Sequence, residues 1–114
     1  MKTIRFLPLA WEDLEQIQRW YLLQMGPKTA RKVRDHILDH IAKLEDYPYL
    51  GTRTPDEWLN ELGYKMLVVK RHVVVYREID EDIVIYLIAD SRTDYLKHFY
   101  LSGRVLQEQA ETYS

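Results

Sequence analysis

The segment "YKMLVVKRHVVVYREIDEDIVIYLI", residues 64–88, contains three runs of β-branched and other apolar residues. Two polar dipeptides, Lys70-Arg71 and Asp80-Glu81, separate the runs and are expected to form turns. The predicted strands are 64–69, 72–79 and 82–88, paired as an antiparallel meander. The last two runs are apolar at most positions, which is typical of central strands covered on both faces. The rest of the chain must therefore cover this sheet.

Two helices joined by a Gly-Pro step precede the sheet. Apolar residues recur every three or four positions from Trp11 to Met25 and again over residues 28–45, the period of amphipathic helices. Gly26 and Pro27 end the first helix and begin the second, so the pair is expected to form an antiparallel helical hairpin. The apolar stripes are formed by Leu14, Ile17, Tyr21 and Met25 in the first helix and by Ala30, Val33, Ile37, Ile41 and Leu44 in the second.

Shorter elements flank the hairpin. The stretch "TIRFLPL" (3–9) predicts a short strand that ends near Pro8. A short helix over 54–63 is predicted from a capping box, with Thr54 as N-cap, Pro55 at the first helical position and Glu57 reaching back. In the first long helix, the acids Glu12, Asp13 and Glu15 are expected in the first turn, where the helix dipole favours them.

The element order is thus β-α-α-β-β-β, an α+β fold in which a helical hairpin packs on one face of a curved antiparallel sheet. The other face must be covered by the tail, a partner or a second subunit. We expect residues 1–100 to form a single domain. We expect residues 101–114 to be a C-terminal tail that is helical, or disordered until it is bound.

Composition limits the functional classes. The chain of 114 residues has no cysteine, which excludes disulfides and thiolate metal sites and favours a reducing cytoplasm. It has no apolar run of the roughly 20 residues that a membrane span needs, and "MKTIRFLPLA" is too interrupted for a secretory signal. The net charge of −2 argues against a protein that binds nucleic acid through bulk positive charge.

A cluster of cationic and aromatic side chains follows the last strand, in "IADSRTDYLKHFY" (88–100). In a meander, the 70–72 turn lies at the same end of the sheet as this segment, so both can contribute to one patch. Such a patch can bind an anionic surface, or hold a scissile phosphate while Arg92 stabilises charge and Tyr95 or His98 moves a proton. The candidate catalytic residues are Arg92, Tyr95 and His98, and the candidate target-binding residues are Lys70, Arg71, His72 and Lys97.

These features also have a plainer structural interpretation. Arg92 can pair with Asp90 or Asp94 while the aromatic rings cap the core.

His36 and His40 lie one helical turn apart, a spacing that can hold a metal ion. No third ligand is evident and the pair lies off the apolar stripe, so we expect neither a metal site nor a cofactor.

The order and spacing of these segments resemble the RelE/ParE superfamily of bacterial toxins over residues 3–98. The segments that carry the resemblance, after the first strand and the "GP" hairpin, are "PYLGTR" (48–53), "GYKMLVV" (63–69), "HVVVYREID" (72–80), "IVIYLI" (83–88) and "SRTDY" (91–95). The resemblance implies the toxin of a type II toxin–antitoxin module of the plasmid-stabilisation kind. It also implies a hetero-oligomer with a small antitoxin whose C-terminal segment wraps the toxin.

The superfamily has two mechanisms. RelE-like members cleave mRNA in the ribosomal A site, without metal, using Arg, Lys and a Tyr or His, whereas ParE-like members lack that set and poison DNA gyrase. Arg92 matches the basic residue that RelE-like proteins place after the last strand. Their catalytic aromatic falls between His98 and Tyr100, and the strand position that often carries a catalytic Arg is Val73 or Val74 here, near Arg71.

The long helical hairpin and the net charge of −2 favour the ParE-like side, because docking into ribosomal RNA requires clustered cations. We therefore expect a cytoplasmic toxin that inhibits growth by poisoning gyrase. The alternatives are a RelE-like ribosome-dependent mRNA endonuclease and a non-toxic binding homologue. Whether the chain is an enzyme stays open between these three.

Overall fold

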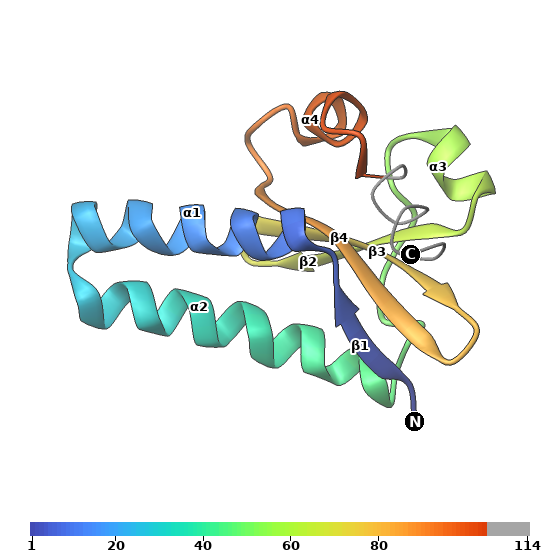
Figure 1. The fold of residues 1–114 in the computed structure, drawn as a ribbon, viewed down its shortest axis with the longest axis horizontal. Helices are drawn as coiled ribbons and strands as arrows, with labels where there is room; N and C mark the ends of the chain where they lie inside the picture. Colours follow the sequence, from blue (N-terminus) through green and yellow to red (C-terminus); the bar gives the residue numbers. More distant parts are fainter. Residues whose placement is uncertain (105–114) are drawn as a thin grey trace.

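The computed structural model describes residues 1–104, which form four strands, four α-helices and one 3-10 turn (Figure 1). In chain order these are β1 (Thr3–Phe6), α1 (Pro8–Met25), α2 (Pro27–Ala42), η1 (Lys43–Glu45), α3 (Glu57–Glu61), β2 (Tyr64–Val69), β3 (His72–Ile79), β4 (Asp82–Asp90) and α4 (Tyr95–Leu101). The predicted α+β order is confirmed. Helix α4 was not predicted, and the predicted structure of residues 105–114 lies outside the described residues.

The sheet has the strand order β1-β4-β3-β2. Strand β3 pairs antiparallel with both β2 and β4, as the meander predicts. Strand β1, however, pairs parallel with β4, from Thr3 opposite Asp82 to Phe6 opposite Ile85. The prediction of a wholly antiparallel sheet is therefore wrong for this pair. The helical hairpin between β1 and the meander carries the chain across the sheet, which allows the parallel arrangement.

The hairpin of α1 and α2 covers one face of the sheet (Figure 1). Its buried residues, including Leu14, Ile37 and Ile41, pack against strand residues such as Val74 and Ile85. Burial of this apolar stripe is the main force that holds the two layers together.

Helix α1 begins earlier than predicted. Its first helical residue is Pro8, whose fixed φ and missing N–H suit this position. Glu12, Asp13 and Glu15 consequently lie beyond the first turn, so the prediction that they complement the helix dipole is wrong. Asp13 is buried instead.

The second face of the sheet is covered by the chain's own short helices, α3 and α4 (Figure 1). Leu59 of α3 and Phe99 of α4 join Tyr64, Val84 and Tyr86 in a second buried cluster. Helix α3 also starts later than predicted: its N-cap is Asp56, whose carboxylate accepts a hydrogen bond from Leu59 N at 3.1 Å. Thr54 and Pro55 precede the helix.

A β-bulge interrupts the pairing of β3 with β4. Val75 lies opposite Leu87 while the next residue, Tyr76, lies opposite Ile85, so Tyr86 has no partner in β3. Strand β1 ends beside Ile85, and beyond that point β4 lacks a neighbouring strand on that side. The backbone groups of β4 in this stretch therefore need other hydrogen-bond partners. No helix within residues 1–104 is both long and apolar enough to cross a membrane.

Candidate functional site

The β2–β3 turn and the segment after β4 lie together at one end of the sheet. His72 is opposite Asp90 in the register, and Ser91 N donates a hydrogen bond of 2.7 Å to Arg71 O. Lys70 adopts a positive φ of 57° in the turn. The structure thus brings the predicted target-binding residues Lys70, Arg71 and His72 close to Arg92.

The Arg92 side chain is held by Asp90. Its Nε donates to Asp90 Oδ1 at 3.0 Å and its Nη2 to Oδ2 at 2.8 Å, while Arg92 N also donates to Oδ1 at 2.8 Å. The sequence predicted this ion pair as the structural alternative to a catalytic role for Arg92. Hydrogen bonds from the Arg92 side chain lower the pKa of Asp90 to about 2.

We expect Arg92→Ala to move the pKa of Asp90 back up towards its ordinary value of 3.8, because the side-chain hydrogen bonds are the largest cause of the shift. The pair stabilises the folded state above pH 3.8 and loses that contribution as the pH falls towards 2. The stability effect is small, because 67% of the Arg92 side chain is exposed. NMR titration of the Asp90 carboxyl carbon measures the shift. An unchanged titration in the variant would contradict the assignment, and Arg53→Ala is the control.

The other candidate catalytic residues lie on α4 and point elsewhere. Tyr95 is half-buried against the second cluster, and its hydroxyl donates to Met66 Sδ at 3.4 Å. Lys97 is exposed, and its backbone N–H donates to Asp94, the N-cap of α4. His98 belongs to a different polar network, described next. Arg92, Tyr95 and His98 therefore have three separate sets of partners.

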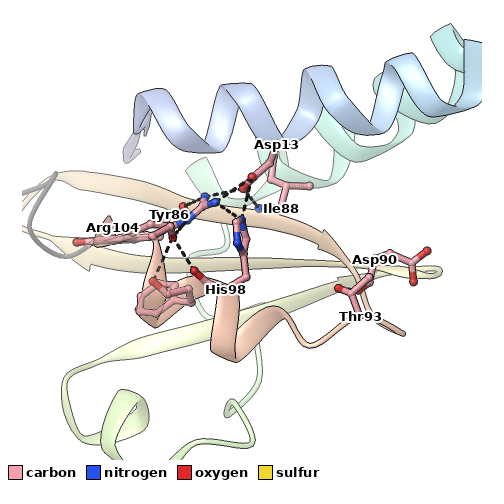
Figure 2. Close-up of polar contacts among 9 residues, drawn as sticks. Asp13, Tyr86, Ile88, Asp90, Thr93, His98 and Arg104 are labelled. Carbon is pink, nitrogen blue, oxygen red and sulfur yellow. Dashed lines mark hydrogen bonds and ion pairs between the residues drawn. The ribbon is translucent and has the colours of Figure 1, made fainter.

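That network joins α1 to the residues after α4 (Figure 2). Arg104, with 1% of its surface exposed, donates from Nη1 to Asp13 Oδ2 at 2.6 Å and from Nη2 to Asp13 Oδ1 at 2.9 Å. Asp13 Oδ2 also accepts from Ile88 N at 3.0 Å, and Tyr86 O accepts from Arg104 at 2.8 Å. Asp13 and Arg104 thus supply the hydrogen-bond partners that β4 needs beyond the bulge.

The remaining donors of Arg104 fix the orientation of α4. Nε donates to Ser102 Oγ at 2.8 Å, and Nη2 lies 2.9 Å from His98 Nε2. Because a guanidinium can only donate, His98 Nε2 must accept, which places the ring proton of the neutral imidazole on Nδ1. Figure 2 shows this network well separated from Asp90 and Thr93.

Sequence reasoning did not identify Asp13 or Arg104. Two signals were present: Asp13 interrupts the apolar stripe of α1 beside Leu14, and Arg104 is the sole cation of residues 101–114. A charged residue on a buried stripe requires an opposite charge. The two residues are 91 positions apart in the sequence, so local patterns do not reveal their pairing.

A cavity of about 330 Å³ lies between α2 and the β2–β3 turn, lined by Tyr21, Thr29, Lys32, Val33, His36, Ile37, Val69, Lys70, Arg71 and His72. A second cavity of about 310 Å³ lies on the α1 side and shares Tyr21 and His72 with the first. His72 is 5% exposed, and its ring meets the edge of Tyr21 at a centroid distance of 6.1 Å. Burial lowers the pKa of His72, with Arg71, Arg92 and His36 adding to the shift and Asp90 opposing it.

The His36–His40 pair has a structural role. The two rings lie 4.4 Å apart, and His40 Nδ1 is 2.9 Å from the backbone oxygen of His36. Burial lowers the pKa of His36, and His40 and Lys70 lower it further. Across residues 1–104, no group of three or more His, Cys, Asp or Glu side chains is arranged to hold a metal ion.

Comparisons with known proteins identify the family. Residues 4–95 match the model of the ParE toxin of the type II toxin–antitoxin system, parDE. A solved structure, described as the chromosomal ParDE TA system from P. aeruginosa, superposes with a TM-score of 0.68 at 20% identity, covering 79% of this chain and 96% of that chain. That similarity supports the fold alone, and no curated protein sequence matches. Because the family model covers most of the sequence, the chain belongs to the ParE toxin family of type II toxin–antitoxin systems.

Proposed function

We propose that this protein inhibits growth by binding and poisoning DNA gyrase, and that a cognate antitoxin neutralises it in a hetero-oligomeric complex in the cytoplasm. The observation that carries this choice is the dispersal of the three candidate catalytic residues. Arg92 pairs with Asp90, the Tyr95 hydroxyl meets Met66, and His98 accepts from Arg104. A nuclease needs its acid, base and charge-stabilising groups around one scissile phosphate.

Charge supports the same choice. The net charge of −2 is unfavourable for docking into ribosomal RNA, which depends on clustered cations. Binding to a protein target has no such requirement, because aromatic and apolar contacts supply most of the affinity in protein interfaces. Exposed rings such as Trp20 and Trp58 are available for this purpose.

The test is to add the purified chain to gyrase and relaxed plasmid DNA. We expect loss of supercoiling and accumulation of cleaved DNA bound to gyrase, while mRNA in a reconstituted translation reaction stays intact. Codon-positioned cuts in that mRNA, with unchanged supercoiling, would overturn the proposal in favour of a ribosome-dependent endonuclease. Growth at the normal rate on overexpression without antitoxin would indicate a non-toxic binding homologue.

A second candidate function, mRNA cleavage, is favoured by the proximity of Lys70, Arg71 and His72 to Arg92. Arg92→Ala separates the two mechanisms. Under the gyrase proposal the Arg92 guanidinium is not catalytic, so the variant should cause no mRNA cleavage and should keep its effect on gyrase within a few-fold. A nuclease in which Arg92 stabilises the transition state would lose about 100-fold or more of its cleavage rate.

A further inference from the structure

His72 is a buried imidazole without an internal hydrogen bond. Only 5% of the surface of His72 is exposed. Within residues 1–104, no donor or acceptor forms a hydrogen bond with its ring. Its one aromatic contact, with the edge of Tyr21, satisfies neither nitrogen. The ring nitrogens are not fully enclosed, so a ligand that enters the cavity can reach them and form the hydrogen bond that the protein does not supply.

The cavity that His72 lines has the composition of an anion site. Three exposed cations, Lys32, Lys70 and Arg71, lie at its rim, and no carboxylate is among its lining residues. Val33 and Ile37 of α2 form an apolar wall together with Val69 of β2. The cavity therefore combines an apolar wall with a cationic rim and a buried hydrogen-bonding ring.

The charged side chains that line this cavity are all cationic, whereas Asp90 does not line it. Burial is the largest cause of the lowered pKa of His72; Asp90 is the strongest electrostatic influence and opposes it, while Arg71, Arg92 and His36 add to it. The Asp90 carboxylate is already engaged by two hydrogen bonds from the Arg92 side chain. An incoming anion consequently meets uncompensated positive charge on Lys70 and Arg71.

We propose that this cavity binds the carboxylate of an acidic side chain from a partner protein, next to an apolar residue of the same segment. The His72 ring donates a hydrogen bond to the carboxylate, Arg71 and Lys32 pair with it at the rim, and the apolar neighbour covers Val33 and Ile37. The volume of about 330 Å³ accommodates one or two side chains. The apolar wall favours a peptide over a nucleic acid phosphate, which would require cations on all sides.

The test uses the purified chain of 114 residues without gyrase or antitoxin, so its failure is independent of the failure of the gyrase proposal. The probe is N-acetyl-Leu-Glu-Leu amide, titrated while imidazole and methyl NMR signals are followed. We expect the signals of His72, Val33 and Val69 to shift together. The matched peptide with Gln in place of Glu should bind about tenfold more weakly, because it lacks the charge.

Variants locate the site. Arg71→Ala and Lys32→Ala should each weaken binding of the Glu peptide by about five- to tenfold. Arg31→Ala, which removes an exposed cation of the same helix that does not line the cavity, should leave it unchanged. These positions are at the surface, so the variants test the proposal even if His72→Gln fails to fold.

The pH dependence of peptide binding, which reports the protonation of His72, gives a second measurement. The bound carboxylate should raise the pKa of His72, so binding should strengthen as the pH falls through the raised value. The charged or titratable groups that act on His72 or contact it are Arg71, Arg92, Asp90, His36 and Tyr21, and His36 is the other imidazole among them. The His36→Gln variant should therefore keep the pH dependence, and His72→Gln should remove it.

Three results would overturn the proposal. The first is equal affinity for the Glu and Gln peptides, and the second is a set of shifted signals outside the cavity. The third is inorganic phosphate binding more tightly than the Glu peptide, which would assign the cavity to a phosphate ligand. If the expected results hold, the same titration with peptides cut from the antitoxin and from gyrase identifies which partner supplies the acid.

Discussion

Arg104→Ala is expected to lower the free energy of unfolding by about 3–5 kcal/mol, the range for breaking a buried ion pair by removing one partner. The Arg104 guanidinium is 1% exposed and uses all five N–H donors, on Asp13, Tyr86, Ser102 and His98. Its removal leaves the Asp13 carboxylate buried with Ile88 N as its remaining close donor. Urea-induced unfolding at neutral pH measures the change.

A matched control is available in the Arg53–Glu57 pair, whose side chains are each 71% exposed. Arg53→Ala should cost far less than Arg104→Ala, because solvent and salt screen exposed ion pairs. The double variant Asp13→Asn, Arg104→Met should be less destabilised than the sum of its single variants, since it leaves no unpaired charge. Equal costs for Arg104→Ala and Arg53→Ala would show that the buried network contributes no more than a surface pair.

Phe99→Ala is also expected to cost about 3–5 kcal/mol, the range for truncating a buried aromatic residue. Phe99 is 1% exposed, and its ring lies 5.5 Å from the Tyr64 ring and 6.2 Å from the Tyr86 ring. It attaches α4 to the second face of the sheet, so the variant should also increase hydrogen exchange throughout α4. Urea unfolding and exchange measured by NMR give the two results.

The control for Phe99 is in the same helix. Leu101 is 76% exposed, and Leu101→Ala should change the free energy of unfolding by less than about 0.5 kcal/mol. If Phe99→Ala were as mild as Leu101→Ala, helix α4 would not contribute to the stability of the second core. Exchange that rose in α4 but left the stability of the sheet unchanged would indicate a helix that unfolds separately.

Most of the fold could be predicted because it follows from local periodicity. The apolar steps of three and four residues in α1 and α2, the Gly-Pro junction and the three β runs each need only neighbouring residues to be recognised. Helix α4 was not predicted, because it is only seven residues long and its aromatic side chains show no clear helical period. The start of α1 was misplaced because Pro8 fits both a strand end and the first turn of a helix.

The candidate site was predictable in part. The order of the strands requires the β2–β3 turn and the end of β4 to share one end of the sheet, so Lys70–His72 and Arg92 lie together. The partners of the individual side chains were not predictable. Residues 95–98 form a helix instead of continuing at the sheet end, and this directs Tyr95 towards Met66 and His98 towards Arg104.

The sequence by itself thus determined the two helices of the hairpin, the meander and the resemblance to the RelE/ParE superfamily, because these depend on patterns within short segments. The tertiary structure alone decided which charges are buried together and which imidazole ring faces a cavity. Asp13 meets Arg104 because strand β1 ends at Phe6, opposite Ile85, and a bulge at Tyr86 leaves backbone groups of β4 to be paired. His72 lines a cationic cavity because α2 packs beside the β2–β3 turn. Such pairings depend on register and packing between distant segments, which local sequence does not encode.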